Sequence, residues 1–213
     1  LILCIDGTAP RRKQYQQRQR RFRAAFENNG GCNFDSNCIT PGTEFMHDLS
    51  DFIDSYIISQ KKKSKYWKSI NVIFSNEKVP GEGEHKAVEF IRNEGTSEES
   101  YCINGPDADL FMLALATHKP NFYILRENID INSADPFLCI DLCQTREKLV
   151  EKLKWESEKH TFVKNQAIND FILMCFIVGN DFLPHVPSIE IIDEGIELMI
   201  DIYIEVGKSQ GHL

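Results

Sequence analysis

This sequence of 213 residues lacks a long apolar run and lacks any closely spaced pair of cysteines. A helix that crosses a membrane needs about 18 or more consecutive apolar residues, and every apolar stretch here is broken earlier by charged or polar residues. No signal-peptide pattern is present either. We therefore expect no membrane partner.

The cysteines also lack the spacing of a zinc site or a disulfide framework. There are seven, an odd number, and none forms a CxxC pair. The two closest pairs, Cys32 with Cys38 and Cys139 with Cys143, have no obvious histidine partner. Several cysteines fall inside apolar strand or helix patterns, as reduced core cysteines do. The pattern favours an intracellular, reducing compartment, and we expect the cytoplasm, with the nucleus as the alternative.

Acidic residues are absent from one stretch, residues 11–23, which carries seven Lys and Arg. The other 200 residues carry 17 basic and 32 acidic side chains, so the net charge of −8 hides a strong asymmetry. Such segregation suits a site that binds phosphate on one element and cations on another. The 42% hydrophobic and 26% charged residues are ordinary for one globular domain.

Short apolar runs alternate with helical patterns through the first two thirds of the chain. The apolar runs predict buried strands at residues 1–5, 71–75, 101–105 and 122–125. The segments between them predict helices at residues 10–28, 40–59, 84–92 and 110–116. This alternation predicts an α/β fold with a doubly wound, mostly parallel sheet. Ligands of such sheets bind beyond the carboxyl ends of the strands.

The last third of the chain is predicted to be helical, at residues 146–155, 162–178 and 189–206. We therefore expect an α/β core over 1–143 and a helical extension over 144–213 that completes the same domain. Residues 128–141 have weak periodicity and predict a loop or the site of an excised insertion, and residues 61–65 predict a solvated loop. Because the chain opens on an apolar strand without Met, we expect that residues precede Leu1.

Six carboxylates fall where this topology places ligand sites: Asp6, Glu82, Glu84, Asp107, Asp109 and Asp181. Together they would repel one another unless cations intervened. Oxygen ligands favour two hard divalent ions, Mg²⁺ or Mn²⁺. Two such ions about 3.5–4 Å apart can activate water and stabilise the leaving oxygen in phosphodiester hydrolysis. The alternative, acids that only cap helices, is weakened because four motifs recur at successive strand and helix ends.

The basic helix predicted after Pro10 separates into two faces at about 100° per residue. Tyr15, Phe22 and Phe26 lie on one side and are expected to face the core. The other side presents one Lys, one amide and two Arg, a set that suits the oxygens of a terminal phosphate: Lys13, Gln17, Arg20 and Arg21. Spacing alone leaves a second interpretation open, a solvated basic face that only steers polyanions.

Five stretches, in this order, resemble the XRN family of 5′→3′ exoribonucleases: IDGTAPRRKQYQQRQRRFR (5–23), FDSNCITPGTEFM (34–46), VPGEGEHK (79–86), GPDADLFMLALATHKPNFYILRE (105–127) and CFIVGNDFLPHVPSIEI (175–191). They cover well over half the chain, and their combination is highly specific. The resemblance implies a fold of the PIN/5′-nuclease type and a processive, Mg²⁺-dependent hydrolase. Its substrate would be single-stranded RNA with a 5′-monophosphate, degraded to nucleoside 5′-monophosphates in RNA decay or processing.

The resemblance also assigns roles. The family's metal-binding acids correspond to the six carboxylates named above, and its 5′-phosphate pocket corresponds to the four residues of the basic helix. A capped or triphosphorylated end would fit that pocket poorly, which implies decapping or decay factors as partners. Thr8 and Pro106 depart from the family pattern without replacing a ligand. The family places a further metal-binding Asp and a base-stacking residue before Leu1, and an RNA-channel segment after Leu213, so this chain alone could be inactive.

Two other functions stay open. A flap-type 5′ DNA endonuclease would share the carboxylates, and a catalytically silent scaffold could bind RNA or decay partners without cleaving. His85 and His185 flank acidic motifs and could contact substrate or water, although a neutral ring hydrogen-bonded to backbone is the simpler expectation. Trp67 and Trp155 could stack on bases, but their segments predict packing instead.

Overall fold

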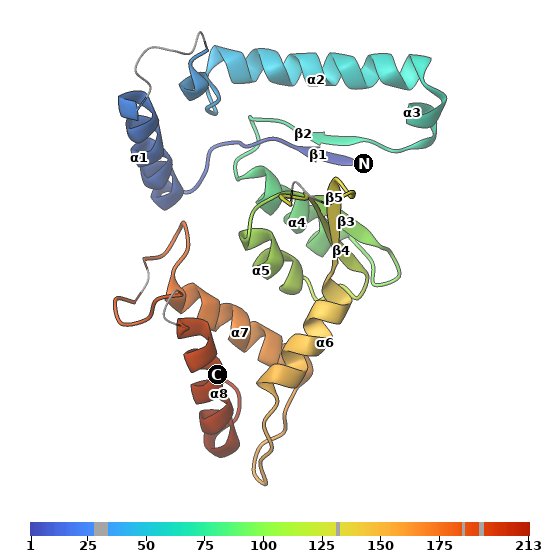
Figure 1. Ribbon diagram of the computed structural model, residues 1–213. Helices are drawn as coiled ribbons and strands as arrows, with labels where there is room; N and C mark the ends of the chain where they lie inside the picture. Colours follow the sequence, from blue (N-terminus) through green and yellow to red (C-terminus); the bar gives the residue numbers. More distant parts are fainter. Residues whose placement is uncertain (28–33, 131–132, 185, 192–193) are drawn as a thin grey trace. The chain divides into compact units, whose positions relative to one another are not determined.

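The computed structural model describes residues 1–27, 34–130, 133–184, 186–191 and 194–213 (Figure 1). The chain forms two compact units, residues 1–90 and 91–213. Both contain helices and strands, so the predicted mixed α/β class is confirmed. None of the helices in the described residues combines the length and apolar character that a membrane crossing requires.

The first unit is built on two short parallel strands. β1 (Ile2–Cys4) pairs with β2 (Ile73–Ser75), with Leu3 opposite Phe74. Its other elements are α1 (Arg11–Glu27), the 3-10 helix η1 (Ser36–Cys38), α2 (Glu44–Lys63), α3 (Lys65–Ser69) and the start of α4 (Gly83–Glu94). The predicted helices over 10–28, 40–59 and 84–92 are confirmed with small changes at their ends.

Residues 61–65 are helical except for Ser64, so the expectation of a solvated loop there is wrong. Lys61–Lys63 form the last turn of α2, where positive charge favours the negative end of the helix dipole. Ser64 then ends α2 and starts α3, because its side-chain oxygen accepts a hydrogen bond from the backbone N–H of Trp67. A serine hydroxyl suits this cap position, since it satisfies a backbone donor that the first helical turn leaves unpaired.

The second unit contains a three-stranded sheet. β3 (Tyr101–Asn104) pairs in parallel with β4 (Phe122–Glu127), and β5 (Phe137–Asp141) pairs antiparallel to β4. Strand β5 lies in the segment that weak periodicity assigned to a loop, so that expectation is wrong for residues 137–141. One face of the sheet packs with α5 (Asp109–Leu115), around Leu110, Ala114, Phe122, Ile124 and Leu142.

In the described residues the strands thus form two sheets, one of two strands and one of three. The parallel pairings β1–β2 and β3–β4 agree with a mostly parallel arrangement. A single doubly wound sheet is not confirmed by these pairings and stays a prediction.

The end of the chain is helical, as predicted. α6 (Leu142–Leu153), α7 (Lys164–Val178) and α8 (Gly195–Gln210) share a core of Leu153, Trp155, Ala167, Phe171, Met174, Val178, Met199, Ile200 and Tyr203. Asp170 is 2% exposed, and one of its carboxylate oxygens accepts hydrogen bonds from the Tyr203 hydroxyl and the His212 ring. This buried polar contact joins α7 to α8 and the residues that follow it. The division at residues 143 and 144 remains a prediction.

The aromatic side of α1 does not face a core in the first unit. Tyr15, Phe22 and Phe26 are 57%, 71% and 87% exposed, so the expectation that they are buried is wrong there. Their spacing still places them on one stripe of the helix. The stripe stays open because no described element of the first unit packs over it.

The backbone after β1 lies against the loop after β2. The Ile5 N–H donates to the Ser75 carbonyl at 3.1 Å, Gly7 N–H donates to Gly81 at 2.9 Å, and Gly81 N–H donates to Thr8 at 2.9 Å. A Cβ at Gly7 would overlap the carbonyl oxygen of Val79. Only glycine permits this approach, which sets the loop that carries Glu82.

Replacing Gly7 with Ala is expected to lower the free energy of unfolding by about 3 kcal/mol, because the added methyl forces two backbone segments apart. Urea denaturation measures the loss. Gly42→Ala is the matched control: Gly42 has a φ of +91° but open space around its Cβ position, so only backbone strain of about 1 kcal/mol is expected. Equal losses in the two variants would contradict the close approach at Gly7.

A candidate metal and anion site

The loop from β2 to α4 is held by a buried lysine. Lys86 is 7% exposed, and its ammonium donates to the carbonyls of Asn76 at 2.8 Å, Val79 at 3.3 Å and Ser75 at 3.4 Å. Burial lowers the pKa of Lys86, an effect that the nearby charges of Cys4, Asp6 and Glu77 oppose. The lysine therefore gathers three carbonyls at the end of β2 and in the loop that follows, two of which also accept a backbone N–H: Ser75 from Ile5 and Asn76 from Val79.

Asp6 fixes the start of α4. Its carboxylate accepts a hydrogen bond from the Gly83 N–H at 2.7 Å, at the end of the helix where backbone donors are unpaired. Gly81, with a φ of +107°, makes the turn that precedes it. As a result Glu82 lies immediately before α4 and Glu84 lies in its first turn, next to the segment that follows β1.

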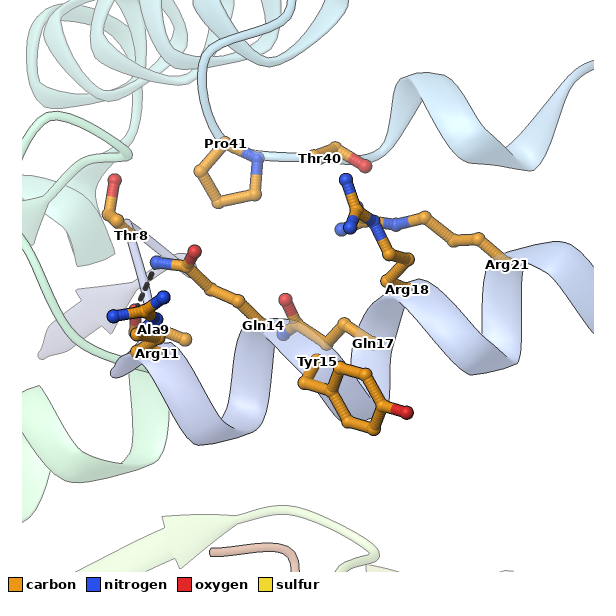
Figure 2. Close-up of a pocket in the computed structure, with 10 residues that line it drawn as sticks. All are labelled: Thr8, Ala9, Arg11, Gln14, Tyr15, Gln17, Arg18, Arg21, Thr40 and Pro41. Atoms are coloured by element: carbon orange, nitrogen blue, oxygen red, sulfur yellow. Dashed lines mark hydrogen bonds between the residues drawn. The ribbon is translucent and has the colours of Figure 1, made fainter.

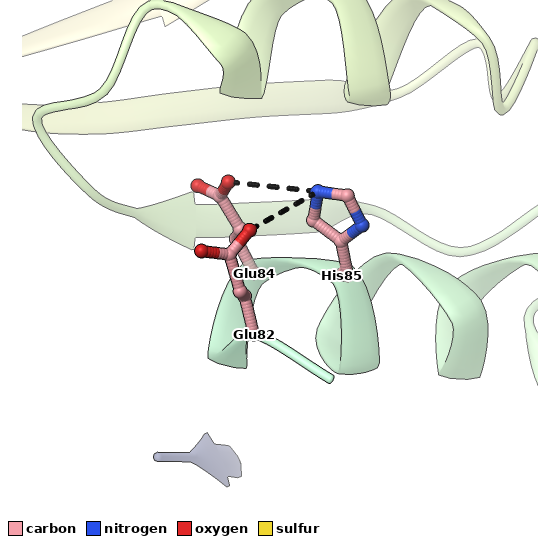
Figure 3. A group of neighbouring side chains, drawn as sticks. All are labelled: Glu82, Glu84 and His85. Atoms are coloured by element: carbon pink, nitrogen blue, oxygen red, sulfur yellow. Dashed lines mark ion pairs between the residues drawn. The ribbon is translucent and has the colours of Figure 1, made fainter. Parts of the chain in front are cut away.

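Glu82, Glu84 and His85 form a group in which one ligand atom from each lies within 4.8 Å of the others. Figure 3 shows one nitrogen of the His85 ring facing both carboxylates, 3.9 Å from Glu82 Oε2 and 3.8 Å from Glu84 Oε1. No other group of three such residues is found in the part of the chain that the structure describes. The arrangement is a possible cation site.

The burial of Glu82 supports a bound cation. Glu82 is 6% exposed, yet its Oε2 atom has no hydrogen-bond donor among the described residues. Leaving a buried carboxylate oxygen unsatisfied is costly, and a divalent ion would remove that cost. Two carboxylates with one imidazole suit Mg²⁺ or Mn²⁺ better than a soft metal. The residues present therefore fit a divalent metal ion, as predicted.

The other carboxylate oxygen of Glu82 is paired with the basic helix. Lys13 Nζ lies 3.2 Å from Glu82 Oε1, and the two side chains are 10% and 8% exposed. This contact joins a residue predicted to bind phosphate to a residue predicted to bind metal. Lys13 thus lies on the carboxylate side of α1.

A cavity of about 500 Å³ lies along another face of α1. Figure 2 shows the side chains of Arg18 and Arg21 both extending toward Thr40, on the segment before α2. The lining residues are Thr8, Ala9, Arg11, Gln14, Tyr15, Gln17, Arg18, Arg21, Thr40 and Pro41. None of the described residues that line this cavity is acidic, so it is suited to an anion.

The predicted phosphate-binding residues are divided between these features. Gln17 and Arg21 line the cavity, Lys13 is paired with Glu82, and Arg20 is exposed and does not line the cavity. Their joint action on one phosphate stays a prediction. Arg18 was not among the predicted phosphate-binding residues, although a helical projection places it on the same face as Gln14 and Arg21.

The predicted metal ligands are likewise only partly assembled. Glu82 and Glu84 come together with His85, while Asp6 binds the start of the same helix. Asp107 and Asp109 lie at the start of α5, and Asp181 follows α7, all in the second unit. The convergence of all six carboxylates stays a prediction. His85 was given little weight, although its i,i+3 spacing from Glu82 at a helix start was a signal for the pair.

Two protein-family models match this chain: "XRN 5'-3' exonuclease N-terminus" over residues 1–128 and "Xrn1 helical domain" over residues 161–213. Among curated proteins, 5'-3' exoribonuclease 2 of Gallus gallus is 36% identical, with 100% of this chain and 30% of the relative covered. The 5'-3' exoribonuclease 1 of Schizosaccharomyces pombe is 39% identical, with 99% and 18% covered, and that of Homo sapiens is 36% identical, with 99% and 14% covered. The chain spans less than a third of the length of these relatives.

Replacing Lys86 with Met keeps most of the side-chain volume but removes the donor to three carbonyls. The free energy of unfolding is expected to fall by about 3 kcal/mol, as for loss of charged hydrogen bonds in a buried site. Urea denaturation measures this change, with Lys78→Met as the control, because Lys78 is exposed on the same loop. A loss in Lys86→Met no larger than in the control would show that the ammonium does not stabilise the loop.

Proposed function

Because the chain belongs to the XRN family of 5′-3′ exonucleases, we propose that it is the metal-dependent core of a 5′→3′ exoribonuclease acting on RNA with a 5′-monophosphate. The products are nucleoside 5′-monophosphates. The names of the relatives support the polarity and the RNA substrate. Metal dependence and selection of a 5′-monophosphate are inferred from the residues described above.

The observation that carries the proposal is the buried oxygen of Glu82 without a donor, in a carboxylate group that contacts the basic helix. A protein with a structural acid at this position would provide a donor, as it does for Asp170. A cation beside Glu82 and an anion beside α1 are what a phosphodiester hydrolase needs at neighbouring positions.

The carboxylates of the proposed site would hold one or two Mg²⁺ or Mn²⁺ ions: Asp6, Glu82, Glu84, Asp107, Asp109 and Asp181. When bound, such ions supply positive charge that eases the deprotonation of water and stabilises the leaving oxygen. The basic helix binds the terminal phosphate and thereby sets which bond is hydrolysed, through Lys13, Gln17, Arg20 and Arg21. An RNA held by its 5′-terminal phosphate has a fixed register at the site, so the RNA is shortened by one nucleotide at a time.

The proposed partners follow from this end selection. A cap or triphosphate adds bulk and charge beyond one terminal phosphate, so RNA would reach the site after decapping. Decapping and decay factors are therefore proposed partners in RNA decay or processing.

The 5′ end of the substrate tests the function directly. The intact protein is expected to degrade 5′-monophosphorylated RNA at least about 100-fold faster than 5′-hydroxyl RNA, because several charged hydrogen bonds to the phosphate are lost. Cleavage is followed on end-labelled oligonucleotides with Mg²⁺ in excess. Internal cuts in DNA flaps, without this preference, would show a flap endonuclease, and RNA binding without any cleavage would show a scaffold.

Asp107→Ala and Asp109→Ala are each expected to lower the cleavage rate by on the order of 1,000-fold, equivalent to several kcal/mol of lost charge stabilisation. Asp107 is exposed and Asp109 is half-buried, so circular dichroism should show an unchanged fold. Asp135→Ala removes an exposed acid elsewhere in the second unit and serves as the control. Unchanged cleavage in both site variants at saturating Mg²⁺ would refute the assignment.

A further inference from the structure

We propose that Lys13 exchanges between Glu82 and the terminal phosphate, so that divalent-cation binding and 5′-phosphate binding strengthen each other. The inference rests on the proposed function, because it takes the metal and the phosphate as the ligands of this site. It starts from the contact of 3.2 Å between Lys13 Nζ and Glu82 Oε1, in which both side chains are about nine-tenths buried.

The Lys13 ammonium neutralises Glu82 in the structure, as a bound metal ion would. Glu82 is buried and Glu84, the second carboxylate in the group with His85, is half-buried, and two negative charges this close together require compensation. In the structure the ammonium supplies it at Oε1, while Oε2 has no donor among the described residues. A divalent cation that binds Glu82 more strongly can therefore displace the Lys13 ammonium from it.

A divalent ion on Glu82 and Glu84 changes the balance at Lys13. The ammonium would then face two positive charges beside its carboxylate partner, in a site with little water to screen them. Like charges at that distance repel, so the Lys13 side chain is released from Glu82. Its long, flexible stem allows the ammonium to move without displacing α1.

The released ammonium has an anion site within reach. Lys13 and Gln17 are four residues apart on α1, so their side chains are neighbours on the helix surface. Gln17 lines the cavity together with Arg18 and Arg21. A terminal phosphate bound there gains a further cationic side chain, beside the arginines that line the cavity, only when Lys13 has left Glu82.

Coupling of this kind is reciprocal. The cation strengthens binding of the 5′-phosphate, and the 5′-phosphate strengthens binding of the cation by the same factor. We expect about tenfold, within the usual range of such effects. A 5′-hydroxyl end has no phosphate to receive Lys13 and should show no coupling.

The first experiment measures Mg²⁺ binding to the intact protein by calorimetry, without RNA. Lys13→Met removes the competing ammonium and is expected to tighten Mg²⁺ binding about tenfold. Arg12→Met removes an equal charge from an exposed position of the same helix and should leave the affinity unchanged. Equal or weaker Mg²⁺ binding in Lys13→Met would overturn the exchange.

The second experiment changes the other member of the pair, the Glu82 carboxylate. Glu82→Gln frees Lys13 without metal, so a 5′-phosphorylated oligonucleotide in EDTA should bind about tenfold tighter than it does to the unsubstituted protein. A 5′-hydroxyl oligonucleotide should bind equally to both. Fluorescence anisotropy reads both affinities. If Lys13→Met does not fold, this arm decides alone, and an unchanged affinity for the phosphorylated end overturns the exchange.

These measurements separate the exchange from the proposed function. Tighter Mg²⁺ binding in Lys13→Met supports the exchange even in a protein that cleaves no RNA, and such a protein would refute the exoribonuclease proposal. Cleavage of 5′-phosphorylated RNA combined with unchanged Mg²⁺ and oligonucleotide affinities in both variants would refute the exchange alone.

Discussion

The burial of one carboxylate, that of Glu82, is the constraint on which the rest of the site depends. A negative charge with little access to water must be compensated nearby. Lys13 compensates one oxygen, and the other has no hydrogen-bond donor among the residues that the structure describes. The contact of Lys13 with Glu82 thus brings the basic helix next to the candidate cation site, and the proposed chemistry needs both.

Backbone contacts hold that carboxylate in place more than side-chain packing does. The loop that carries it crosses over Gly7, is gathered by the Lys86 ammonium, and ends where Asp6 binds the Gly83 N–H. Each contact pairs a backbone group of this loop with a side chain or with another backbone segment. The charged side chains of Lys86 and Asp6 therefore hold the loop in place before any ligand binds. The two paired strands β1 and β2 carry the segments that these side chains connect.

The sequence predicted most elements of the fold, because apolar runs and helix caps are local signals. It failed where the local pattern is weak or incomplete. Strand β5 was missed because residues 128–141 have weak periodicity, although this strand pairs with its neighbour in sequence, β4. The burial of Tyr15, Phe22 and Phe26 was wrong because a stripe does not reveal what covers it. The acids Glu82 and Glu84 were predicted to lie together, and they do. The Lys13 contact with Glu82 could not be predicted, since helical spacing gives a direction on α1 but no partner in space.

The exposed aromatic stripe of α1, formed by Tyr15, Phe22 and Phe26, also determines how a fragment that contains this helix would behave in solution. Three rings that are 57%, 71% and 87% exposed, next to one another on a helix, form an apolar strip of the kind that drives proteins to adhere. The net charge of −8 would not prevent this, because the acids lie elsewhere and the same helix is strongly basic. Colloidal stability of such a fragment would then depend on polyanions in the buffer, which would mask the arginines beside the rings.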